Sequence, residues 1–396
     1  MWYKYWWMNY GARAGLVHTA RALYALNWMD MAPALEYIKT AMNLTVVELG
    51  TLVTAFYVGI AMFQVLGGYL SSYIGDKTTS LIGLLFVSIF AITSGLSGNF
   101  IELIISRFLA GLSAALFFSP ALSLLASIVP ENKYAFHIGI YNGAFNVGGG
   151  VGIIGWAILD QYMGYRIPFI IAGLATLGLF VVLVFLFRNI ENIKTNKSDI
   201  FTSFKKVFSN RIIILVAFIG IASMVSETII GQFFVYYLES IKYSIDLAGS
   251  ISALFLIIGF LGGILGGYHF SRTKYKIGTF IAINIVLSLS LILIGFIHYY
   301  IFIIIIAIAI GMITVYGMSI TYTIVRYLAR RDLVSLTLSF VNTLQLLVAV
   351  AVPVIFTLIV SSYNYELAWL SMGVLGLVFL PLIFLARGNL IKVVPS

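Results

Sequence analysis

The chain has 396 residues, of which 61% are hydrophobic and only 9% are charged. Soluble domains carry about 25% charged residues, which form the polar surface that faces water. A chain of this composition cannot build such a surface, which excludes a soluble enzyme, a nucleic-acid-binding domain and a disordered chain. We therefore expect the main solvent to be the lipid bilayer. The absence of Cys also excludes disulfides, Cys-ligated zinc and thiol nucleophiles.

Apolar runs long enough to cross the hydrocarbon core as helices recur along the chain. They follow an N-terminal segment, Met1–Tyr10, whose Trp and Tyr content is typical of an interfacial aromatic segment and not of a signal peptide. A crossing helix needs about 20 apolar residues. We predict twelve spans, at 16–40, 48–72, 78–98, 100–126, 137–160, 167–188, 212–238, 247–268, 277–297, 300–326, 334–360 and 367–387.

The longest polar interval runs from Arg188 to Arg211 and divides the twelve predicted spans into two sets of six. We therefore predict an N-terminal six-helix bundle over residues 1–190 and a cytoplasmic linker over 191–211. A C-terminal six-helix bundle is predicted over residues 212–396.

The positions of the basic residues indicate the orientation in the membrane, because cytoplasmic segments carry an excess of Lys and Arg. With the N-terminus inside, eighteen of the 23 Lys and Arg residues fall in cytoplasmic segments. Only Lys39, Arg166 and Lys242 lie outside, and Arg21 and Arg107 lie within spans. We therefore expect a multi-pass protein of the plasma membrane with both termini in the cytoplasm. The net charge of +9 then needs no nucleic-acid partner to explain it.

The two halves resemble each other at an offset of about 199–200 residues. Leu66–Tyr69 at the end of span 2 has the same sequence as Leu265–Tyr268 at the end of span 8, and Asn142 aligns with Asn342. Parallel repeats of this kind place a substrate site between the halves, near the middle of the membrane. The predicted fold class is an all-α membrane protein with twelve transmembrane helices in two pseudo-symmetric six-helix bundles.

This organisation resembles the major facilitator superfamily, and a local motif supports the resemblance. The family's loop between spans 2 and 3 reads roughly Gly-x-x-x-Asp-Arg-x-Gly-Arg-Arg. Gly68 and Gly75 match its glycines, whereas Ser72 and Tyr73 replace its Asp and first Arg. In that family the motif helps to close the cytoplasmic face. The resemblance assigns to gating Gly68, Gly75, Asp76, Lys77, Gly267 and Arg272.

Two further motifs point to the same family. Arg107–Gly111 in span 4 resembles its Arg-x-x-x-Gly signature. Gly139, Gly148 and Gly152 in span 5 have the spacing of its antiporter glycine motif. Ile153, however, stands where that motif has Pro. The resemblance implies a secondary transporter that works by alternating access, with spans 1, 4, 7 and 10 lining its cavity.

Four ionisable residues stand out because they lie well inside the predicted spans, where each costs about 2.5–3.5 kcal/mol on insertion scales. They are Arg21, Asp30, Arg107 and Glu227. At about 1.5 Å per residue, the last three lie about 20 Å above the inner ends of their spans. Because the family places span 4 beside span 1, we expect Asp30 to pair with Arg107.

These charges predict a proton-coupling site made of Asp30, Arg107 and Glu227. Glu227 has no basic residue near it in span 7, and an unpaired buried carboxylate binds a proton readily. We interpret it as the proton carrier, and Asp30 as a switch that Arg107 holds until protonation or substrate binding releases it. The alternative is a structural ion pair and a Glu227 that merely faces water. Arg21 either extends to the lipid headgroups or attracts an anionic substrate.

Aromatic and amide side chains at similar depths complete the predicted substrate site. Aromatic rings beside carboxylates suit lipophilic cations, whereas amides and Tyr hydroxyls suit sugars or small acids. For any single aromatic residue, contact with lipid or with another helix is the competing interpretation. The predicted substrate-binding residues are Arg21, Tyr24, Asn27, Trp28, Asn142, Asn146, Gln232, Tyr316, Tyr322 and Asn342.

The sequence has no His-Glu-x-x-His, no Asp-Asp-x-x-Asp and no P-loop. This counts against a membrane protease, a prenyltransferase and an ATP-driven pump, so we predict no catalytic residue, metal ligand or cofactor. We expect a monomeric secondary transporter whose partners are a small-molecule substrate, protons and the bilayer. Drug or lipophilic-cation antiport with protons, proton-coupled uptake of an organic acid or other metabolite, and an uncoupled facilitator remain open.

Overall fold

The computed structural model describes residues 10–190, 207–329 and 334–393, and every regular element in them is helical. The elements are α1 (Tyr10–Trp28), α2 (Met31–Met42), α3 (Val46–Ile74), α4 (Asp76–Leu96), α5 (Phe100–Ile128), α6 (Glu131–Met163), α7 (Arg166–Leu186), α9 (Arg211–Ile219), α10 (Ile221–Ser240), α11 (Ile245–Arg272), α12 (Lys276–Ile294), α13 (Tyr300–Leu328), α14 (Val334–Ser362), α15 (Tyr365–Val378), the 3₁₀ turn η2 (Leu380–Leu382) and α16 (Ile383–Val393).

Eleven helices in the described part of the chain are long and apolar enough to cross a membrane. They correspond to predicted spans 2 to 12, and their ends lie within a few residues of the predicted ones, except that the helix of span 7 begins at Ile221, nine residues after the predicted start. The predicted fold class, an all-α membrane protein, is confirmed. Predicted span 1 is the exception, because α1 and α2 share it: α1 has 19 residues but is not apolar enough to qualify, and α2, with 12 residues, is too short.

The prediction of one continuous helix over 16–40 is wrong, because the chain leaves the helix after Trp28 and resumes it at Met31. Pro33 explains the break. It has no N–H to donate to the carbonyl of Met29, four residues earlier, and its ring clashes with that carbonyl. Asp30 therefore lies at the N-terminus of α2, where the helix dipole favours a negative charge.

Predicted spans 7 and 12 are also divided. Gly220 separates α9 from α10, and Gln345 of α14 donates its amide to the carbonyls of Ala217 and Gly220, at 3.1 and 3.4 Å. This contact satisfies backbone groups that the break releases and that lipid could not satisfy. Pro381 lies in the 3₁₀ turn that separates α15 from α16.

Polar side chains begin several of the helices, as the preference for oxygen-bearing residues at helix N-termini requires. Thr45 and Glu48 form a capping box at the start of α3. The side chains of Asn99, Asn210 and Asn364 accept backbone N–H groups in the first turns of α5, α9 and α15. These residues therefore fix where the apolar helices begin.

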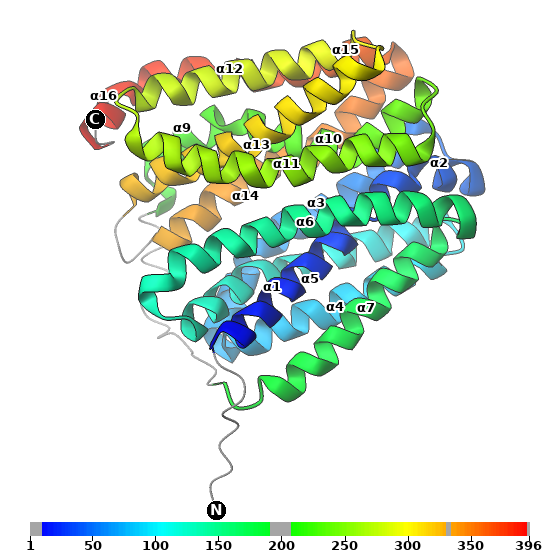
Figure 1. Ribbon diagram of the computed structural model, residues 1–396, viewed down its shortest axis with the longest axis horizontal. Helices are drawn as coiled ribbons and strands as arrows, with labels where there is room; N and C mark the ends of the chain where they lie inside the picture. The colour runs from blue at the N-terminus through cyan, green and yellow to red at the C-terminus, as the bar shows by residue number, and fades with distance from the viewer. Residues whose placement is uncertain (1–9, 191–206, 330–333, 394–396) are drawn as a thin grey trace, which may run out of the picture.

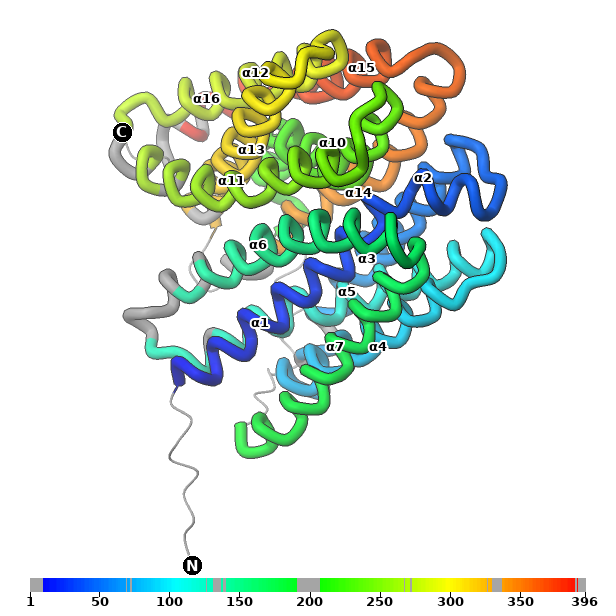
Figure 2. Tube along the Cα trace, turned by 45° about the vertical axis from the view of Figure 1, so that its right-hand side comes forward, coloured from blue at the N-terminus to red at the C-terminus, as the bar shows by residue number. Residues whose placement is uncertain are grey.

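The helices form two groups, α1–α7 and α9–α16, which lie against each other (Figure 1). The groups remain distinct in the turned view, with α3 against α14 and α6 against α11 (Figure 2). The start of α1 and α16 lie at one end of the molecule, here named the α16 end, and α2 lies at the other, the α2 end (Figure 1). The domain boundaries stay a prediction, and residues 191–206 of the predicted linker lie outside the described residues.

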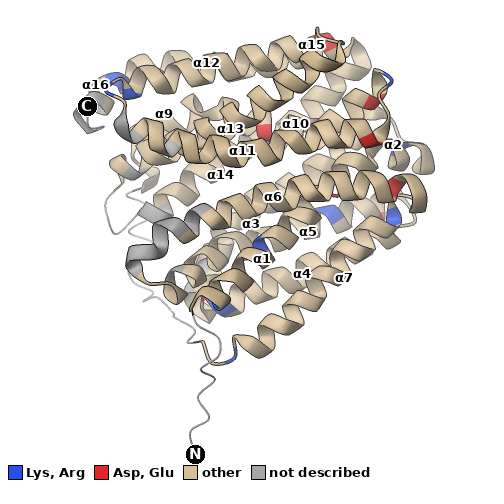
Figure 3. Cartoon of the chain, in the orientation of Figure 1, with Lys and Arg blue, Asp and Glu red and all other residues tan. Residues whose placement is uncertain are grey.

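Charged residues gather at the two ends of the helices, and the lengths between them are almost free of charge (Figure 3). Lys and Arg lie at the α16 end, and most Asp and Glu lie toward the α2 end (Figure 3). This distribution is the one that a bilayer imposes, because charge within the hydrocarbon core is costly. The few charged positions midway along the helices are therefore the candidates for function.

Candidate functional site

A cavity of about 290 Å³ lies between the two groups of helices. Helices α1, α3, α5 and α6 line it on one side, and α10, α11, α13 and α14 on the other. It holds a majority of the predicted substrate-binding residues: Arg21, Tyr24, Trp28, Asn142, Asn146, Tyr322 and Asn342. Glu227, predicted to carry the proton, also lines it.

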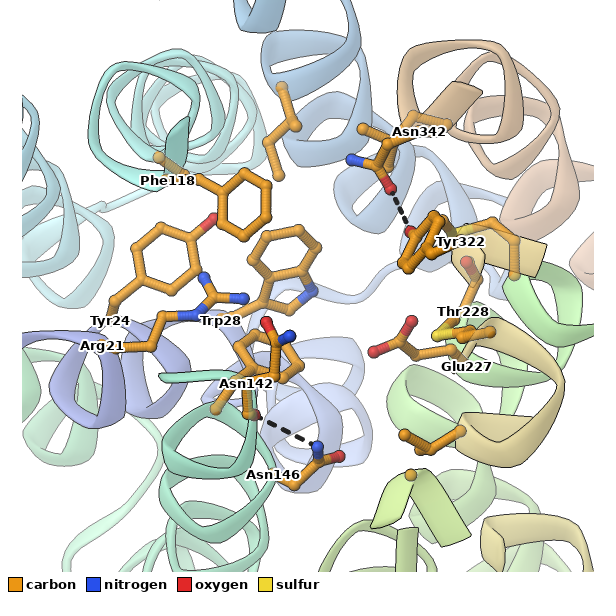
Figure 4. A pocket seen from close by; sticks show the side chains of 18 of the residues that line it. Arg21, Tyr24, Trp28, Phe118, Asn142, Asn146, Glu227, Thr228, Tyr322 and Asn342 are labelled. Atoms are coloured by element: carbon orange, nitrogen blue, oxygen red, sulfur yellow. Dashed lines mark hydrogen bonds between the residues drawn. The ribbon is translucent and has the colours of Figure 1, made fainter. Parts of the chain in front are cut away.

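Arg21 lies in a cage of aromatic rings on the α1 side of the cavity (Figure 4). Its guanidinium carbon is 4.4–5.1 Å from the ring centres of Tyr24, Phe118, Tyr141 and Phe145. The residue is 7% exposed, and its Nε and Nη1 have no hydrogen-bond partner among the described residues. The side chain therefore does not extend to the headgroups, and it presents unpaired N–H groups inside the protein.

Glu227 reaches into the cavity from α10, on the side opposite Arg21 (Figure 4). Almost every residue of α10 is buried, so the helix runs through the protein interior. Among the described residues, none forms a hydrogen bond or an ion pair with the Glu227 carboxylate. Beside it, Tyr322 donates its hydroxyl to the Asn342 side-chain oxygen at 3.0 Å. Glu227 is thus an acceptor that faces open space.

Asp30 and Arg107 form the predicted ion pair, with 2.9 Å between Oδ1 and Nη1. Their side chains are 0% and 2% exposed, and the rings of Phe56 and Phe169 lie 4.7 and 5.7 Å from the guanidinium carbon. Neither residue lines the cavity, which corrects the expectation that they lie there with Glu227. The break after α1 turns Asp30 toward α5, away from the cavity face of α1.

An aromatic contact nevertheless links the ion pair to the cavity. The Phe56 ring lies next to the Arg107 guanidinium on one side and 5.0 Å from the Trp28 ring on the other. Trp28 lines the cavity and donates its indole N–H to the Tyr57 hydroxyl at 3.4 Å. Rearrangement of the ion pair can therefore reach the cavity wall through two packed rings.

Three other predicted substrate-binding residues do not line the cavity. Asn27 points to α7 and donates to Thr176 Oγ1 at 2.7 Å. Gln232 lies nearer the α2 end and donates to the Trp28 carbonyl at 3.4 Å. Tyr316 is hydrogen-bonded to His269. Each of these side chains points to another face of its helix, or lies about one turn along it, from a residue that lines the cavity. The predicted ends of a span do not reveal such a difference.

The predicted gating loop joins α3 to α4 at Gly75, which has a φ of 88°. Asp76 accepts hydrogen bonds from the hydroxyls of Ser71 and Ser123, and so ties this loop to α5. Lys77 donates to the Ile190 carbonyl at 2.6 Å, beyond the end of α7. Gly68 lies in α3 with open space around its Cα. Gly267 and Arg272 belong to α11, but their surroundings and the Arg272 side chain are not described by the structure.

Three buried polar or charged residues were not predicted. Tyr57 and Gln64 of α3 line the cavity, although the family resemblance did not assign span 2 to it. Gln64, a single amide in an apolar run, was a signal that could have been used. Asp160 of α6 is 1% exposed, and neither carboxylate oxygen has a hydrogen-bond partner among the described residues. The sequence places Asp160 at a span end, where a solvated carboxylate is the usual expectation.

An all-helical bundle with a polar cavity between two halves is the architecture of a membrane transport protein. The model of the Major Facilitator Superfamily matches residues 17–351 of this chain. The chain belongs to that superfamily. It is a membrane transporter and not an enzyme, and the resemblance noted in the sequence is confirmed.

Two curated relatives illustrate the range of related transporters. The quinolone resistance protein NorA of Staphylococcus aureus is 28% identical over 270 residues, which are 65% of this chain and 66% of NorA. The match thus spans slightly less than two thirds of that relative. The probable sulfoacetate transporter SauU of Cupriavidus necator is 25% identical over 170 residues, 42% of this chain and 40% of SauU.

Solved structures share the fold at low sequence identity. A bacterial homologue of the human lysosomal transporter Spinster, inward-facing and unoccupied, has a TM-score of 0.80 and 14% identity. The alignment covers 96% of this chain and 98% of that one. A POT family transporter in complex with 5-aminolevulinic acid has a TM-score of 0.79 and 14% identity, with 98% of each chain covered.

Proposed function

We propose that this chain is a proton-coupled antiporter that exports small amphipathic molecules with a cationic centre. The observation that carries the proposal is the Glu227 carboxylate, which faces the cavity with no ion-pair partner among the described residues. An unpaired carboxylate in a low-dielectric site is costly until a positive charge neutralises it. A proton or an organic cation can do so, but not both at once. This competition couples exit of the cation to entry of a proton.

The rest of the cavity fits an aromatic, amphipathic ligand. Trp28, Tyr57 and Phe145 offer ring faces and edges, and Asn142 and Asn146 offer amides. Such walls bind flat apolar bodies and stabilise cations near rings. On the opposite wall, the Arg21 cation repels a basic group and attracts an acceptor. The two charges therefore orient a ligand with its cationic centre at Glu227 and its acceptor end at Arg21.

Asp30 and Arg107 act, in this proposal, through the shape of the helices and not through ligand contact. Their ion pair fixes the break between α1 and α2 against α5. Protonation of Asp30 would remove the attraction and free the break to move. Phe56 and Trp28 would carry that movement to the cavity wall.

The proposed orientation puts both termini in the cytoplasm of a plasma-membrane protein that works as a monomer, so that the α2 end faces outward. The two halves meet near this end. Gln232 of α10 donates to the Trp28 carbonyl, and Thr54 of α3 donates to the Val350 carbonyl of α14 at 3.0 Å. These contacts close the outer side of the cavity, as in an inward-facing transporter.

The names of the two curated relatives support different candidate functions. The name of NorA, a quinolone resistance protein, supports export of drug-like molecules. The name of SauU, a probable sulfoacetate transporter, supports the second candidate, proton-coupled uptake of an organic anion. Arg21 favours that second function, because a guanidinium that lines the cavity can donate to a carboxylate or sulfonate.

Transport by purified protein in proteoliposomes tests the proposal. We expect an imposed pH gradient to drive movement of tetraphenylphosphonium against the proton flow, and Glu227→Gln to abolish this coupling. Benzoate that accumulates together with protons, with no movement of the cation, would replace the proposal by anion uptake. Cation movement that ignores the pH gradient would indicate a facilitator.

A further inference from the structure

A second cavity, of about 860 Å³, lies on the flank of the C-terminal group of helices. It lies between α12 on one side and the end of α15, the turn η2 and α16 on the other. It shares no lining residue with the central cavity. We call it the α12–α16 groove.

The packing of α12 against α15 explains why the groove exists. Toward the α2 end, a side chain at Gly373 would collide with the Ser288 carbonyl, and one at Gly295 would collide with Trp369. The helices are therefore in close contact there. Toward the α16 end, Pro381 interrupts the helix, and α16 takes a new direction. The space left between α12 and α16 is not filled by any described side chain.

The lining of the groove separates into a basic end and an apolar length. Lys274, Lys276 and Arg387 lie at the α16 end, and no Asp or Glu is among the lining residues. Ile277, Ile281 and Ile285 follow one another along one face of α12, over about 12 Å. Figure 3 shows Lys or Arg at this corner of the molecule, where α16 and the start of α12 meet.

Side chains around the groove are exposed in a way that fits lipid and not water. Tyr275 is 80% exposed and Phe384 is 76% exposed. An aromatic ring beside basic residues, such as that of Tyr275, is typical of the membrane interface. An exposed Phe, such as Phe384, is typical of contact with acyl chains. Lys276 is only 7% exposed, so the protein covers most of its side chain.

We propose that the α12–α16 groove binds one anionic phospholipid of the leaflet at the α16 end. The phosphate would contact Lys274 and Arg387, and an acyl chain would lie along the isoleucines of α12. Basic pockets between membrane helices recognise anionic headgroups in this way. The charge complementarity selects an anionic lipid over a zwitterionic one, and the apolar length selects a lipid over a soluble anion.

Native mass spectrometry of the purified full-length protein tests the proposal, with phosphatidylglycerol, phosphatidylcholine and inorganic phosphate as separate probes. We expect a bound phosphatidylglycerol that survives gentle activation, and weaker binding of the other two. Lys274→Gln and Arg387→Gln should each reduce phosphatidylglycerol affinity about fivefold. Arg211→Gln removes an exposed charge at the start of α9, outside the groove, and should leave the affinity unchanged.

A second variant tests the acyl site without changing charge. Gly278 lines the groove, and a Cβ there would meet only Tyr275, at 3.9 Å. Gly278→Leu should therefore fold normally, fill the groove and displace the lipid. Equal binding of phosphatidylcholine, equal binding of inorganic phosphate, or unchanged binding in both Gly278→Leu and Arg387→Gln would each overturn the proposal.

Discussion

Two acid–base arrangements lie inside the helices, and they differ in what separates the charges. Asp30 and Arg107 touch at 2.9 Å and are sealed from the cavity. Glu227 and Arg21 face the same cavity from opposite walls, and each lacks an ion-pair partner among the described residues. A closed pair holds helices together, whereas an open pair leaves both charges available to a ligand or a proton. In the proposed function, the same residue types thus support structure in one region and transport in the other.

The largest expected effect comes from breaking the closed pair. Arg107→Leu leaves Asp30 buried without a partner and should lower the free energy of unfolding by about 3–5 kcal/mol. Denaturation of the purified protein in detergent measures this loss. The double variant Asp30→Asn, Arg107→Leu should recover part of it, because the uncompensated charge is removed. Equal stability of all three proteins would refute the structural role of the pair.

Removing a charge from the open pair of Glu227 and Arg21 should reduce function without lowering stability. Glu227→Gln removes an unpaired charge, so we expect stability to stay the same or rise. Affinity for a lipophilic cation should fall about 10- to 100-fold, as expected for loss of a charged partner. In the wild type, acidic pH should weaken cation binding because protons compete for Glu227. Binding to Glu227→Gln should not depend on pH, and a persistent pH dependence would assign the proton to another group.

Arg21→Lys should have a smaller effect, because it keeps the charge and removes the planar guanidinium that stacks among the rings. We expect a loss of about 1–2 kcal/mol in stability, since a lysine ammonium cannot contact four rings equally well. Binding of benzoate, if it occurs, should weaken together with stability. Thermal unfolding and a benzoate titration measure the two effects, and an unchanged melting temperature would show that the aromatic cage contributes little.

The smallest expected effect lies at the break between α9 and α10. Gln345→Leu removes the amide that donates to the Ala217 and Gly220 carbonyls. We expect about 0.6–1.7 kcal/mol of destabilisation, between the mean and the maximum for hydrogen bonds between membrane helices. Gln64→Leu is a matched control, because Gln64 Oε1 has no partner among the described residues. A larger loss of stability in Gln64→Leu than in Gln345→Leu would show that the break between α9 and α10 needs no side-chain hydrogen bond.

The sequence predicted the features that depend only on how deep a residue lies along its span. The apolar runs gave the spans, and similar depths in neighbouring spans gave the pairing of Asp30 with Arg107. Direction around a helix was harder, because adjacent residues point about 100° apart. Asn27 therefore faces α7 while the adjacent Trp28 faces the cavity. After Trp28, the break at Pro33 turns Asp30 in yet another direction. Pro33 was visible in the sequence, but its effect on Asp30 depends on where α5 packs.

Arg21 shows a second limit of the sequence. An arginine two turns into a span is compatible with a side chain that extends to the headgroups and with one that turns inward. The inward direction depends on rings from α5 and α6, namely Phe118, Tyr141 and Phe145, which no local pattern connects to Arg21. Asp160 was missed for a related reason, since its burial is produced by neighbouring helices and not by its own span.

Proton release on ligand binding tests the central claim, that Glu227 exchanges its proton for a cation while Asp30 holds the fold. Tetraphenylphosphonium is added to detergent-solubilised protein at mildly acidic pH in weak buffer with a pH-sensitive dye. We predict release of about one proton per bound cation in the wild type and in folded Asp30→Asn, and none in Glu227→Gln. Undiminished release from Glu227→Gln, or its loss in Asp30→Asn alone, would contradict the account.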